Sequence, residues 1–527
     1  MAAQVLEQPA ARGMHPGAEI LSVSPVDGSV LSAARMVAPS QVPALVERAR
    51  AAAPGWFELP IAGRLERLRA LRRGLARRAD PLARTLCRES GKPLAECYGA
   101  ELIPTLEALR WLERRAPRLL APERLRRFPR RSTLEWRPHG VVAALTPWNY
   151  PLFLAVPLLA AALAAGNTLV WKPSELALAV SGEIQALLEE AGLGGVALTA
   201  TGDRSTGEAL VRAGADKYFL IGSAETGRAV LEELGRRLTP AVAELSGCDP
   251  MLVLADADLD LAARAAVWSR LTGAGQTCMA PKRVLVEEAV YEPFLQRARA
   301  AVAALRVGDP EEAEVDLGPV RTPSARAAAL EAVGEALRRG ARLLYGGRAL
   351  PGPGCFLEPT LLADCTPEMR VFREDLFAPV LAVGRVPSVE AGLELAGRSP
   401  YALTASVWTR DARRGRELAR RLPGGVVSVN DVMLPAADPA VPSGGGGASG
   451  YGRMRGAAGL REMVRTRVID EGPPGWLPRR HFFPYRAETP RLLAGWIEAR
   501  EGASWRDRLR GLWSGWRAAR ELGRQGE

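Results

Sequence analysis

The chain has 527 residues, 47% of them hydrophobic, and a formal net charge of +11. A chain of this length exceeds one ordinary core, so two or three domains are expected. Its basic residues are spread along the whole length, which argues against a nucleic-acid partner. The six cysteines, with no secretory signal at the start, indicate reduced thiols and a cytoplasmic protein.

The first clear unit lies between residues 141 and 171. Residues 141–145 predict a short buried strand, 151–165 a buried helix and 168–171 a second strand. The uncharged helix falls short of the roughly 20 residues that cross a bilayer. Asn149 lies in the turn after the first strand, where parallel sheets bind their ligands.

Strands and helices continue to alternate, which predicts an α/β fold with parallel sheets covered on both faces. A helix is expected at 181–190, and strands at 196–201, 217–221 and 251–254. The pattern restarts after Pro240, so a domain boundary is placed near residue 240. The glycine-rich run Ser443–Gly447 predicts a flexible loop instead of a regular element.

The tail, residues 471–527, has a different composition. It holds five of the twelve tryptophans: Trp476, Trp496, Trp505, Trp513 and Trp516. Helical spacing places three of them on one face with Leu509 and Leu512, and arginines occupy much of the remaining surface. Such a helix can lie in a membrane interface or pack on a neighbouring domain or subunit. Packing is the favoured interpretation, with peripheral membrane contact as the alternative.

Three residues supply a complete set of chemical functions. Cys278 offers a thiol that can attack a carbonyl carbon. Asn149 offers an amide that can donate to the resulting oxyanion. Glu244 offers a carboxylate that can deprotonate a water molecule. No metal is needed for this chemistry.

Around these residues the chain resembles the aldehyde dehydrogenase superfamily, from about residue 20 to 470. The resemblance rests on ordered motifs: Glu89–Pro93, Thr146–Pro151, Trp171–Glu175, Ile221–Ser223, Glu244–Gly247, Gly275–Cys278, Gly308–Pro310, Leu317–Pro319, Glu358–Thr360, Glu374–Pro379 and Ser449–Arg453. It implies two parallel-sheet α/β domains and a small β extension that joins subunits into a homodimer or homotetramer.

The resemblance implies that Cys278 is the nucleophile. Asn149 and the Cys278 backbone N–H would stabilise the oxyanion, hydride would pass to a nicotinamide, and Glu244 would activate the water that hydrolyses the thioester. A CoA-acylating enzyme is the alternative, but it would not need a base at Glu244. A non-catalytic scaffold would have no reason to keep all three residues.

The dinucleotide site lacks a Gly-x-Gly-x-x-Gly fingerprint. The resemblance instead places Lys172 and Glu175 on the adenosine ribose, and Gly222 with Ser223 near the pyrophosphate. Because a carboxylate at the ribose repels a 2′-phosphate, NAD is expected, with NADP as the alternative. Further cofactor contacts are expected from Trp148, Ser174, Leu245, Asp375 and Phe377.

Four positions depart from the family pattern. Asp375 stands where a glutamate commonly holds the nicotinamide ribose, and it is shorter by one methylene. Ser246 replaces a common glycine, Cys248 a common lysine and Gly273 a common asparagine. None of these changes removes a catalytic group. Cys248 is expected to be an inert structural thiol.

The substrate is expected to be an apolar aliphatic or aromatic aldehyde. The resemblance places the apolar segment Leu152–Leu158 and residues 431–441 beside the substrate tunnel. These residues serve equally well as plain core, and a succinate-semialdehyde-type substrate remains the alternative.

The expected domains follow from these motifs. Residues 20–240 form a dinucleotide-binding domain, with 122–138 as part of the β extension, and residues 241–440 form the catalytic domain. Residues 441–470 return to the cofactor domain and the extension, for which Phe128–Pro138 and Val464–Asp470 are the candidate strands. The tail, 471–527, follows as a basic, tryptophan-rich segment.

Overall fold

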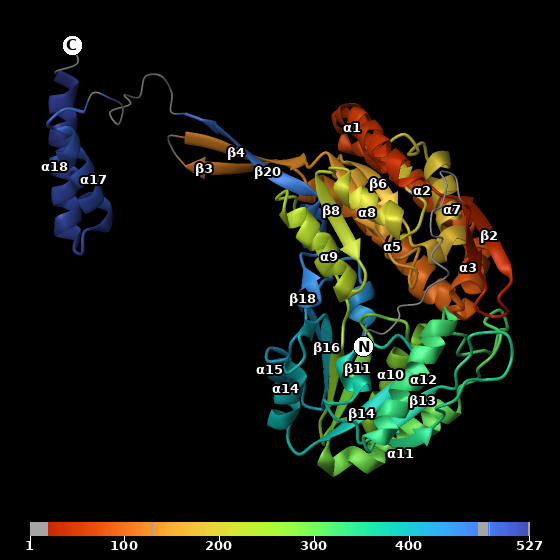
Figure 1. The fold of residues 1–527 in the computed structure, drawn as a ribbon. Coiled ribbons are helices and arrows are strands. Elements are labelled where there is room, and N and C mark those ends of the chain that lie inside the picture. Colours follow the sequence, from red (N-terminus) through yellow and green to blue (C-terminus); the bar gives the residue numbers. More distant parts are fainter. Residues whose placement is uncertain (1–18, 128–129, 473–482, 484, 525–527) are drawn as a thin grey trace. The chain divides into compact units, whose positions relative to one another are not determined.

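The computed structural model describes residues 19–127, 130–472, 483 and 485–524. Contacts divide the chain into two compact units. The first consists of the residues up to 121 together with 136–467, and the second of residues 122–135 and those from 468 onward. Figure 1 shows the elements of both units in chain order.

The first unit contains a six-stranded sheet in the order β19-β9-β8-β5-β6-β7. All its pairs are parallel except β19 with β9. Its strands are β5 (Val141–Leu145), β6 (Thr168–Lys172), β7 (Ala197–Thr199), β8 (Lys217–Ile221), β9 (Ala241–Glu244) and β19 (Gly450–Tyr451). The central strands are buried almost throughout, as parallel strands covered on both faces must be.

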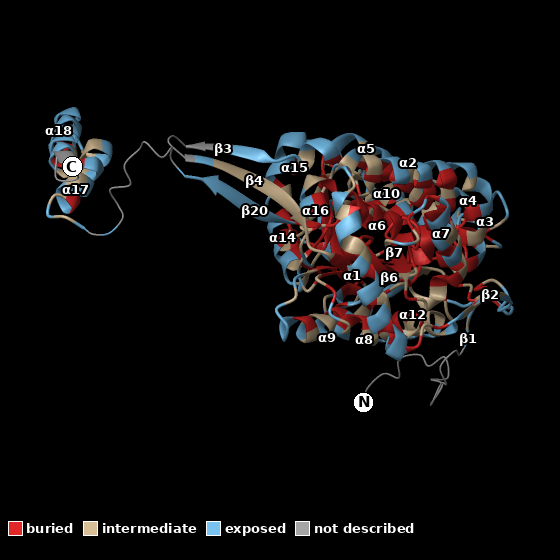
Figure 2. Cartoon of the chain, turned by 90° about the horizontal axis from the view of Figure 1, so that it is seen from above, coloured by how far each residue is buried: buried red, intermediate tan, exposed pale blue. Residues whose placement is uncertain are grey.

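Helices cover both faces of this sheet because successive strand residues point to opposite sides. Val141 and Ala143 pack with α1 (Val42–Glu58) and α8 (Arg204–Arg212). Val142 and Ala144 belong to the opposite core. The helices of that core are α2 (Ile61–Arg77), α3 (Ala79–Ser90), α5 (Ile103–Leu119), α6 (Val156–Ala164) and α7 (Leu178–Glu190). Figure 2 shows buried α6 inside this layer.

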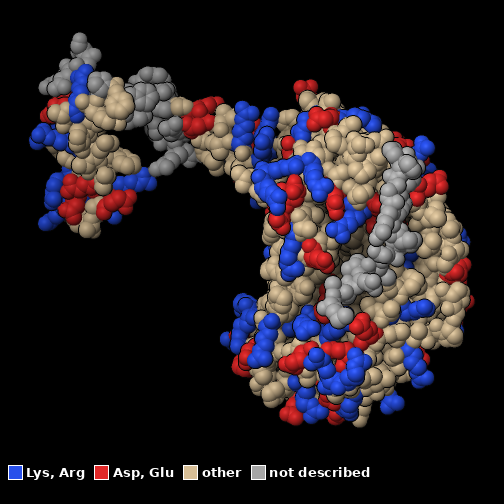
Figure 3. Space-filling view, in the orientation of Figure 1, with Lys and Arg blue, Asp and Glu red and all other residues tan. Residues whose placement is uncertain are grey.

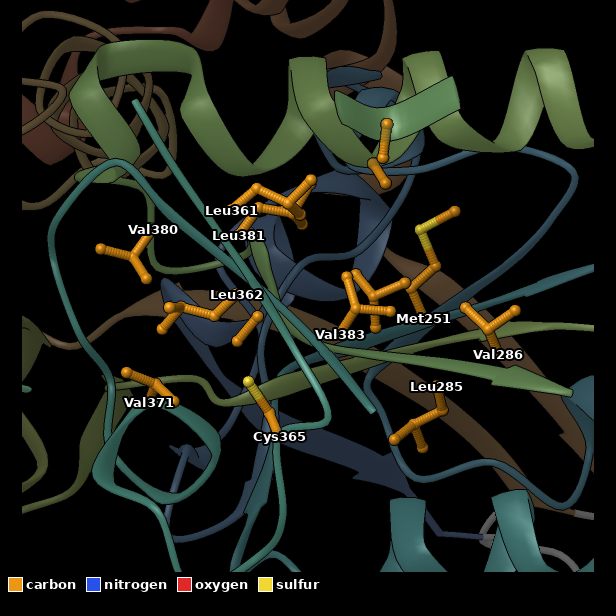
Figure 4. Close-up of a cluster of buried hydrophobic side chains, with 14 of the residues drawn as sticks. Met251, Leu285, Val286, Leu361, Leu362, Cys365, Val371, Val380, Leu381 and Val383 are labelled. Carbon is orange, nitrogen blue, oxygen red and sulfur yellow. The ribbon is translucent and has the colours of Figure 1, made fainter. Parts of the chain in front are cut away.

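A seven-stranded sheet forms the other half of the unit, in the order β12-β13-β14-β11-β10-β16-β17. Its strands are β10 (Asp249–Val253), β11 (Pro281–Glu287), β12 (Arg342–Tyr345), β13 (Thr360–Ala363), β14 (Val380–Val386), β16 (Thr404–Trp408) and β17 (Val426–Val429). The helices packed around it include α10 (Leu259–Leu271), α11 (Tyr291–Ala303), α12 (Pro323–Arg338), α14 (Val389–Gly397) and α15 (Ala412–Ala419). Figure 4 shows the aliphatic core, with Leu285, Leu362 and Val383 among its side chains.

The second unit contains strand and helix segments. Strands β3 (Glu123–Arg127), β4 (Arg130–Pro138) and β20 (Val464–Glu471) form a three-stranded sheet in the order β20-β4-β3. Further along the chain, α17 (Thr489–Glu501) and α18 (Trp505–Arg524) pack on each other. Phe128, the first residue of one candidate strand, and Trp476 of the tail lie outside the described residues.

The expected α/β architecture with two parallel-sheet halves is confirmed, and the strands expected at 141–145 and 217–221 match β5 and β8. The helix expected at 151–165 begins only at Val156, because Pro157 fits the first turn of a helix and residues 151–155 form turns. The first sheet extends to β9, so the sheets change a few residues beyond residue 240.

The loop predicted at Ser443–Gly447 is found in part: residues 443–445 form no regular element, whereas residues 446 and 447 form a short strand. Strand β18 (Gly446–Gly447) pairs with β15 (Tyr401–Ala402), and Ser443 is fully buried. Glycines permit this packing because backbones approach closely here. At Gly447, where φ is +57°, a Cβ would lie 2.6 Å from the Pro400 carbonyl oxygen.

Within the described residues, no helix combines the length and the apolar character that crossing a bilayer requires.

Candidate active site

Four sets of expected site residues lie at the carboxyl ends of neighbouring strands in the six-stranded sheet. In sheet order, Glu244 ends β9, Gly222 and Ser223 follow β8, Asn149 follows β5, and Lys172 ends β6. In open α/β sheets this edge is where ligands bind. The topology therefore brings residues far apart in the sequence to a common edge.

Cys278 reaches the site from the other sheet. It lies between a tight turn, Thr272–Gly275, and the start of β11. At Gly275, where φ is +72°, a Cβ would lie 2.0 Å from the Ala378 carbonyl oxygen, so only glycine fits this turn. The cysteine is thus held by a closely packed backbone.

The Asn149 side chain is tied to the segment that carries Cys278. Its Nδ2 donates to the Gln276 carbonyl oxygen at 2.9 Å, and the residue is buried. A primary amide has two N–H donors, so one hydrogen bond leaves the other for a ligand. No hydrogen bond within the described part of the chain uses the Cys278 backbone N–H.

Glu244 is buried and sparsely hydrogen-bonded. Its Oε2 accepts from Ser443 Oγ at 3.3 Å, whereas Oε1 has no partner among the described residues. Burial raises the pKa of Glu244, and the Arg455 charge and the Ser443 hydrogen bond oppose that rise. A carboxylate with a raised pKa and an open oxygen is suited to accept a proton.

The Cys278 thiol also titrates unusually. Burial, followed by the Glu244 charge, raises the pKa of Cys278 to about 12, while Lys282 opposes the rise. Only the thiolate is a good nucleophile, so any cation near the sulfur aids its reactivity. Cys248 is fully buried, and burial raises the pKa of Cys248 to about 11, which agrees with a structural thiol.

All four lysines of this arginine-rich chain are buried and ion-paired. The N–O distances are 2.5–3.0 Å for the pairs Lys92–Glu101, Lys172–Glu175, Lys217–Glu462 and Lys282–Asp375. A buried charge needs such a partner because desolvation is costly. The rare lysines therefore occupy structurally demanding positions.

One cavity of about 260 Å³ joins Cys278 to the end of β8. Helix α9 (Ala224–Gly235) begins there, and Ser223 caps it by accepting from the Thr226 N–H at 3.1 Å. A helix N-terminus of this kind attracts phosphate. Other lining residues are Trp148, Asn149, Glu244, Leu245, Asp375 and Phe377. The donor set and the carboxylate fit a dinucleotide with phosphates at one end and a ribose near Cys278.

Three expected cofactor residues lie apart from this cavity lining. Lys172 Nζ pairs with Glu175 Oε2 at 3.0 Å, and Ser174 Oγ accepts from the Leu176 N–H at 3.2 Å. Lys172 is the last residue of β6, and Ser174 and Glu175 follow it, two strands beyond β8 in the sheet.

A second cavity, of about 350 Å³, is also lined by Cys278. Of the apolar segment Leu152–Leu158, only Phe153 and Leu154 line it, and the remaining residues except the half-buried Pro157 are core. Met433, Leu434 and Ala437 line it from the expected segment 431–441. Its charged lining residues are Glu96 and Arg455.

Sequence reasoning missed three contributors to the site. Arg455 stacks on the Phe153 ring at 4.0 Å, Ser443 donates to Glu244, and Lys282 donates to the carbonyl oxygens of Thr277 and Cys278. Lys282 carried one available signal, since it is one of only four lysines in the chain. The other two gave none, because their importance depends on contacts distant in sequence.

Comparison with known proteins agrees with this geometry. The profile of the aldehyde dehydrogenase family matches residues 14–469. The chain is 34% identical to 4,4′-diapolycopene aldehyde oxidase of Methylomonas sp, over 87% of this chain and 88% of that protein. It is 33% identical to the succinate semialdehyde dehydrogenase [NAD(P)+] Sad of Escherichia coli K12, over 86% and 98%.

The structure is similar to that of a Mycobacterium tuberculosis aldehyde dehydrogenase complexed with NAD+. The TM-score is 0.82 at 30% identity, with 87% of this chain and 96% of that chain covered. The family match over most of the length and this structural similarity show that the chain belongs to the aldehyde dehydrogenase family.

Proposed function

We propose that this enzyme oxidises an apolar aldehyde to the carboxylic acid through Cys278. The supporting observation is that Cys278 lines two cavities at once, one predominantly apolar and one bordered by a helix N-terminus and Asp375. An aldehyde in the first cavity and a nicotinamide in the second would therefore meet at the sulfur.

Residues of this chain can be assigned to the proton transfers and to the developing negative charge of this reaction. The Cys278 thiol releases its proton to solvent, and the sulfur adds to the aldehyde carbon. Asn149 Nδ2 and the Cys278 N–H donate to the oxygen that becomes negative. A bound NAD would supply the acceptor for the hydride that leaves this carbon. Glu244 then removes a proton from water, which attacks the thioester. The acid departs, and Glu244 returns the proton to the sulfur, which re-forms the thiol.

We propose NAD as the cofactor, with NADP as the alternative. Glu175 would accept from the ribose hydroxyls beside Lys172, and Gly222 and Ser223 would bind the pyrophosphate. Trp148, Ser174, Leu245 and Phe377 would contact the dinucleotide, and Asp375 would hold the nicotinamide ribose. Two relatives, from Deinococcus radiodurans and Synechocystis, are named as NADP(+) enzymes, which supports NADP as the alternative cofactor.

The apolar substrate rests on the lining of the cavity. Phe153, Leu154, Met433 and Leu434 surround the approach to Cys278, and the Glu96 carboxylate would repel an anionic substrate. Arg455 supports the second candidate, a semialdehyde such as the one named for the Escherichia coli relative, because a guanidinium can bind a carboxylate.

We further propose that residues 20–240 bind the dinucleotide and residues 241–440 carry the chemistry. The sheet of β3, β4 and β20 would join subunits into a homodimer or homotetramer. Light scattering of the purified protein tests this assembly, and a monomer would contradict it.

Steady-state assays test the substrate and the cofactor together. We expect a higher kcat/KM for a medium-chain aldehyde than for succinate semialdehyde, and for NAD than for NADP. A preference for the semialdehyde would support the Arg455 candidate instead. A preference for NADP would contradict the role given to Glu175.

A further inference from the structure

Helices α17 and α18 pack on each other through glycines. A Cβ at Gly495 would lie 2.5 Å from the Gly515 backbone nitrogen, and one at Gly511 would lie 2.2 Å from the Ala499 nitrogen. The two backbones are therefore in direct contact. Seams of small residues are typical of helices whose association does not depend on burying large apolar side chains between them.

Most large apolar side chains of both helices are exposed instead of packed at this seam, and only Leu492 and Leu522 among them are half-buried. The others are 50–67% exposed: Leu493, Trp496, Ile497, Trp505, Leu509, Leu512, Trp513 and Trp516. On α18 the buried positions are Gly511 and Ala518. We call Trp505, Leu509, Leu512, Trp513 and Trp516 the tryptophan face. Figure 2 shows both helices largely exposed.

This arrangement leaves the hairpin almost without a core. Among the side chains described in α17 and α18, the buried residues are Thr489, Gly495, Gly511 and Ala518. Such small residues bury too little apolar surface to offset the entropy of ordering the two helices. A large exposed apolar face therefore marks a surface that something else covers.

The charges around the tryptophan face indicate the chemistry of the partner that covers it. Helix α18 has six arginines against one aspartate and one glutamate, a net charge of +4. Arginines stack over three tryptophans of the face, with Arg506 over Trp505, Arg517 over Trp513 and Arg520 over Trp516 at 4.8–5.4 Å. Figure 3 shows uncharged surface on this hairpin, with basic and acidic residues around it.

We propose that the tryptophan face docks this enzyme onto an anionic phospholipid surface. The indole rings and leucines would lie at the boundary of the acyl chains, where amphipathic rings are stable. The flanking guanidinium groups would reach the lipid phosphates. This surface is separate from the reaction at Cys278 and does not depend on the proposed substrate.

Vesicle flotation of the full-length protein tests the proposal. We expect the protein to float with phosphatidylcholine vesicles that contain about 30 mol% phosphatidylglycerol, and at least about tenfold less with pure phosphatidylcholine. Leu512→Ser combined with Trp516→Ser should reduce flotation at least about tenfold. Leu238→Ser is the matched control, because Leu238 is 91% exposed in the other unit and its loss should change nothing.

The readouts separate this proposal from its competitors. Oxidation of a water-soluble aldehyde should be equal in the wild type and both variants, which verifies that they are folded. Absence of flotation in the wild type, or undiminished flotation in the double variant, would overturn the proposal. If the protein did not float and the double variant had fewer subunits, the face would be an interface between copies.

Discussion

Lys282 and Asp375 form a buried ion pair beside the nucleophile, with Nζ and Oδ1 2.9 Å apart. Lys282 also donates to the Thr277 carbonyl oxygen at 2.8 Å, and Asp375 accepts from the Gly247 N–H at 3.3 Å. From the resemblance to the family, a lysine is expected at position 248 and a glutamate at position 375. In this chain Lys282 supplies a cation from β11, and it holds the shorter Asp375 at the cavity.

Lys282→Met should slow alkylation of Cys278 by iodoacetamide at a given pH. Lys282 lowers the pKa of the thiol, so its removal raises that pKa and reduces the thiolate fraction. We expect the rate–pH curve to move to higher pH and KM for NAD to rise. Lys217→Met is the control, because Lys217 is equally buried but pairs with Glu462. An equal shift in both variants would contradict a specific role for Lys282.

Glu244→Gln should lower steady-state kcat by about 100-fold or more, the usual loss for a general base. The first turnover should remain fast, so pre-steady-state measurement should show a burst of NADH. The Glu244 charge raises the pKa of Cys278, so alkylation of this variant should move to lower pH. A wild-type kcat would refute the assignment of Glu244 as the base.

Ser443→Ala should move the acidic limb of the kcat–pH profile to higher pH. The hydrogen bond from Ser443 opposes the rise in the pKa of Glu244, so its loss raises that pKa and leaves fewer carboxylates ionised at a given pH. Ser449→Ala is the matched control, because Ser449 is equally buried in the same segment but donates to the Ser246 carbonyl oxygen. An unmoved limb in Ser443→Ala would be inconsistent with this contact.

Glu175→Gln should raise the ratio of kcat/KM for NADP to that for NAD by about tenfold, which corresponds to about 1.4 kcal/mol. The substitution removes the charge that repels a 2′-phosphate and leaves Lys172 to attract it. Glu183→Gln, on the surface of α7, changes the net charge equally and should leave the ratio unchanged. If both variants gave the wild-type ratio, Glu175 would not select the cofactor.

Some residues of this site could be predicted from the sequence, and others could not. Asn149 could be placed because it follows a strand recognisable from its own residues, whereas Glu244 was assigned through its motif, and the strand that it ends, β9, was not predicted. The contact between Ser443 and Glu244 joins positions 199 residues apart, and the glycine-rich segment was expected to be a loop. Its backbone pairs with β15, and Ser443 reaches Glu244, only in the folded chain, and local sequence does not encode these contacts.

In the tail, too, one feature could be predicted from the sequence and another could not. Helical spacing predicted the tryptophan face, and the structure has α18 there. Gly495 and Gly511 carried no such signal, because glycine in a helix ordinarily only weakens it. Their function as a seam depends on two helices meeting, which periodicity within one helix does not reveal.

The nucleophile is the central element of this mechanism, and the most direct test is NAD reduction over a panel of aldehydes with the wild type and Cys278→Ala. We expect the wild type to reduce NAD with at least one apolar aldehyde and Cys278→Ala to lose at least about 1000-fold in kcat. Cys248→Ala should keep its activity, since that thiol is buried away from solvent. Activity that survived in Cys278→Ala would contradict the mechanism.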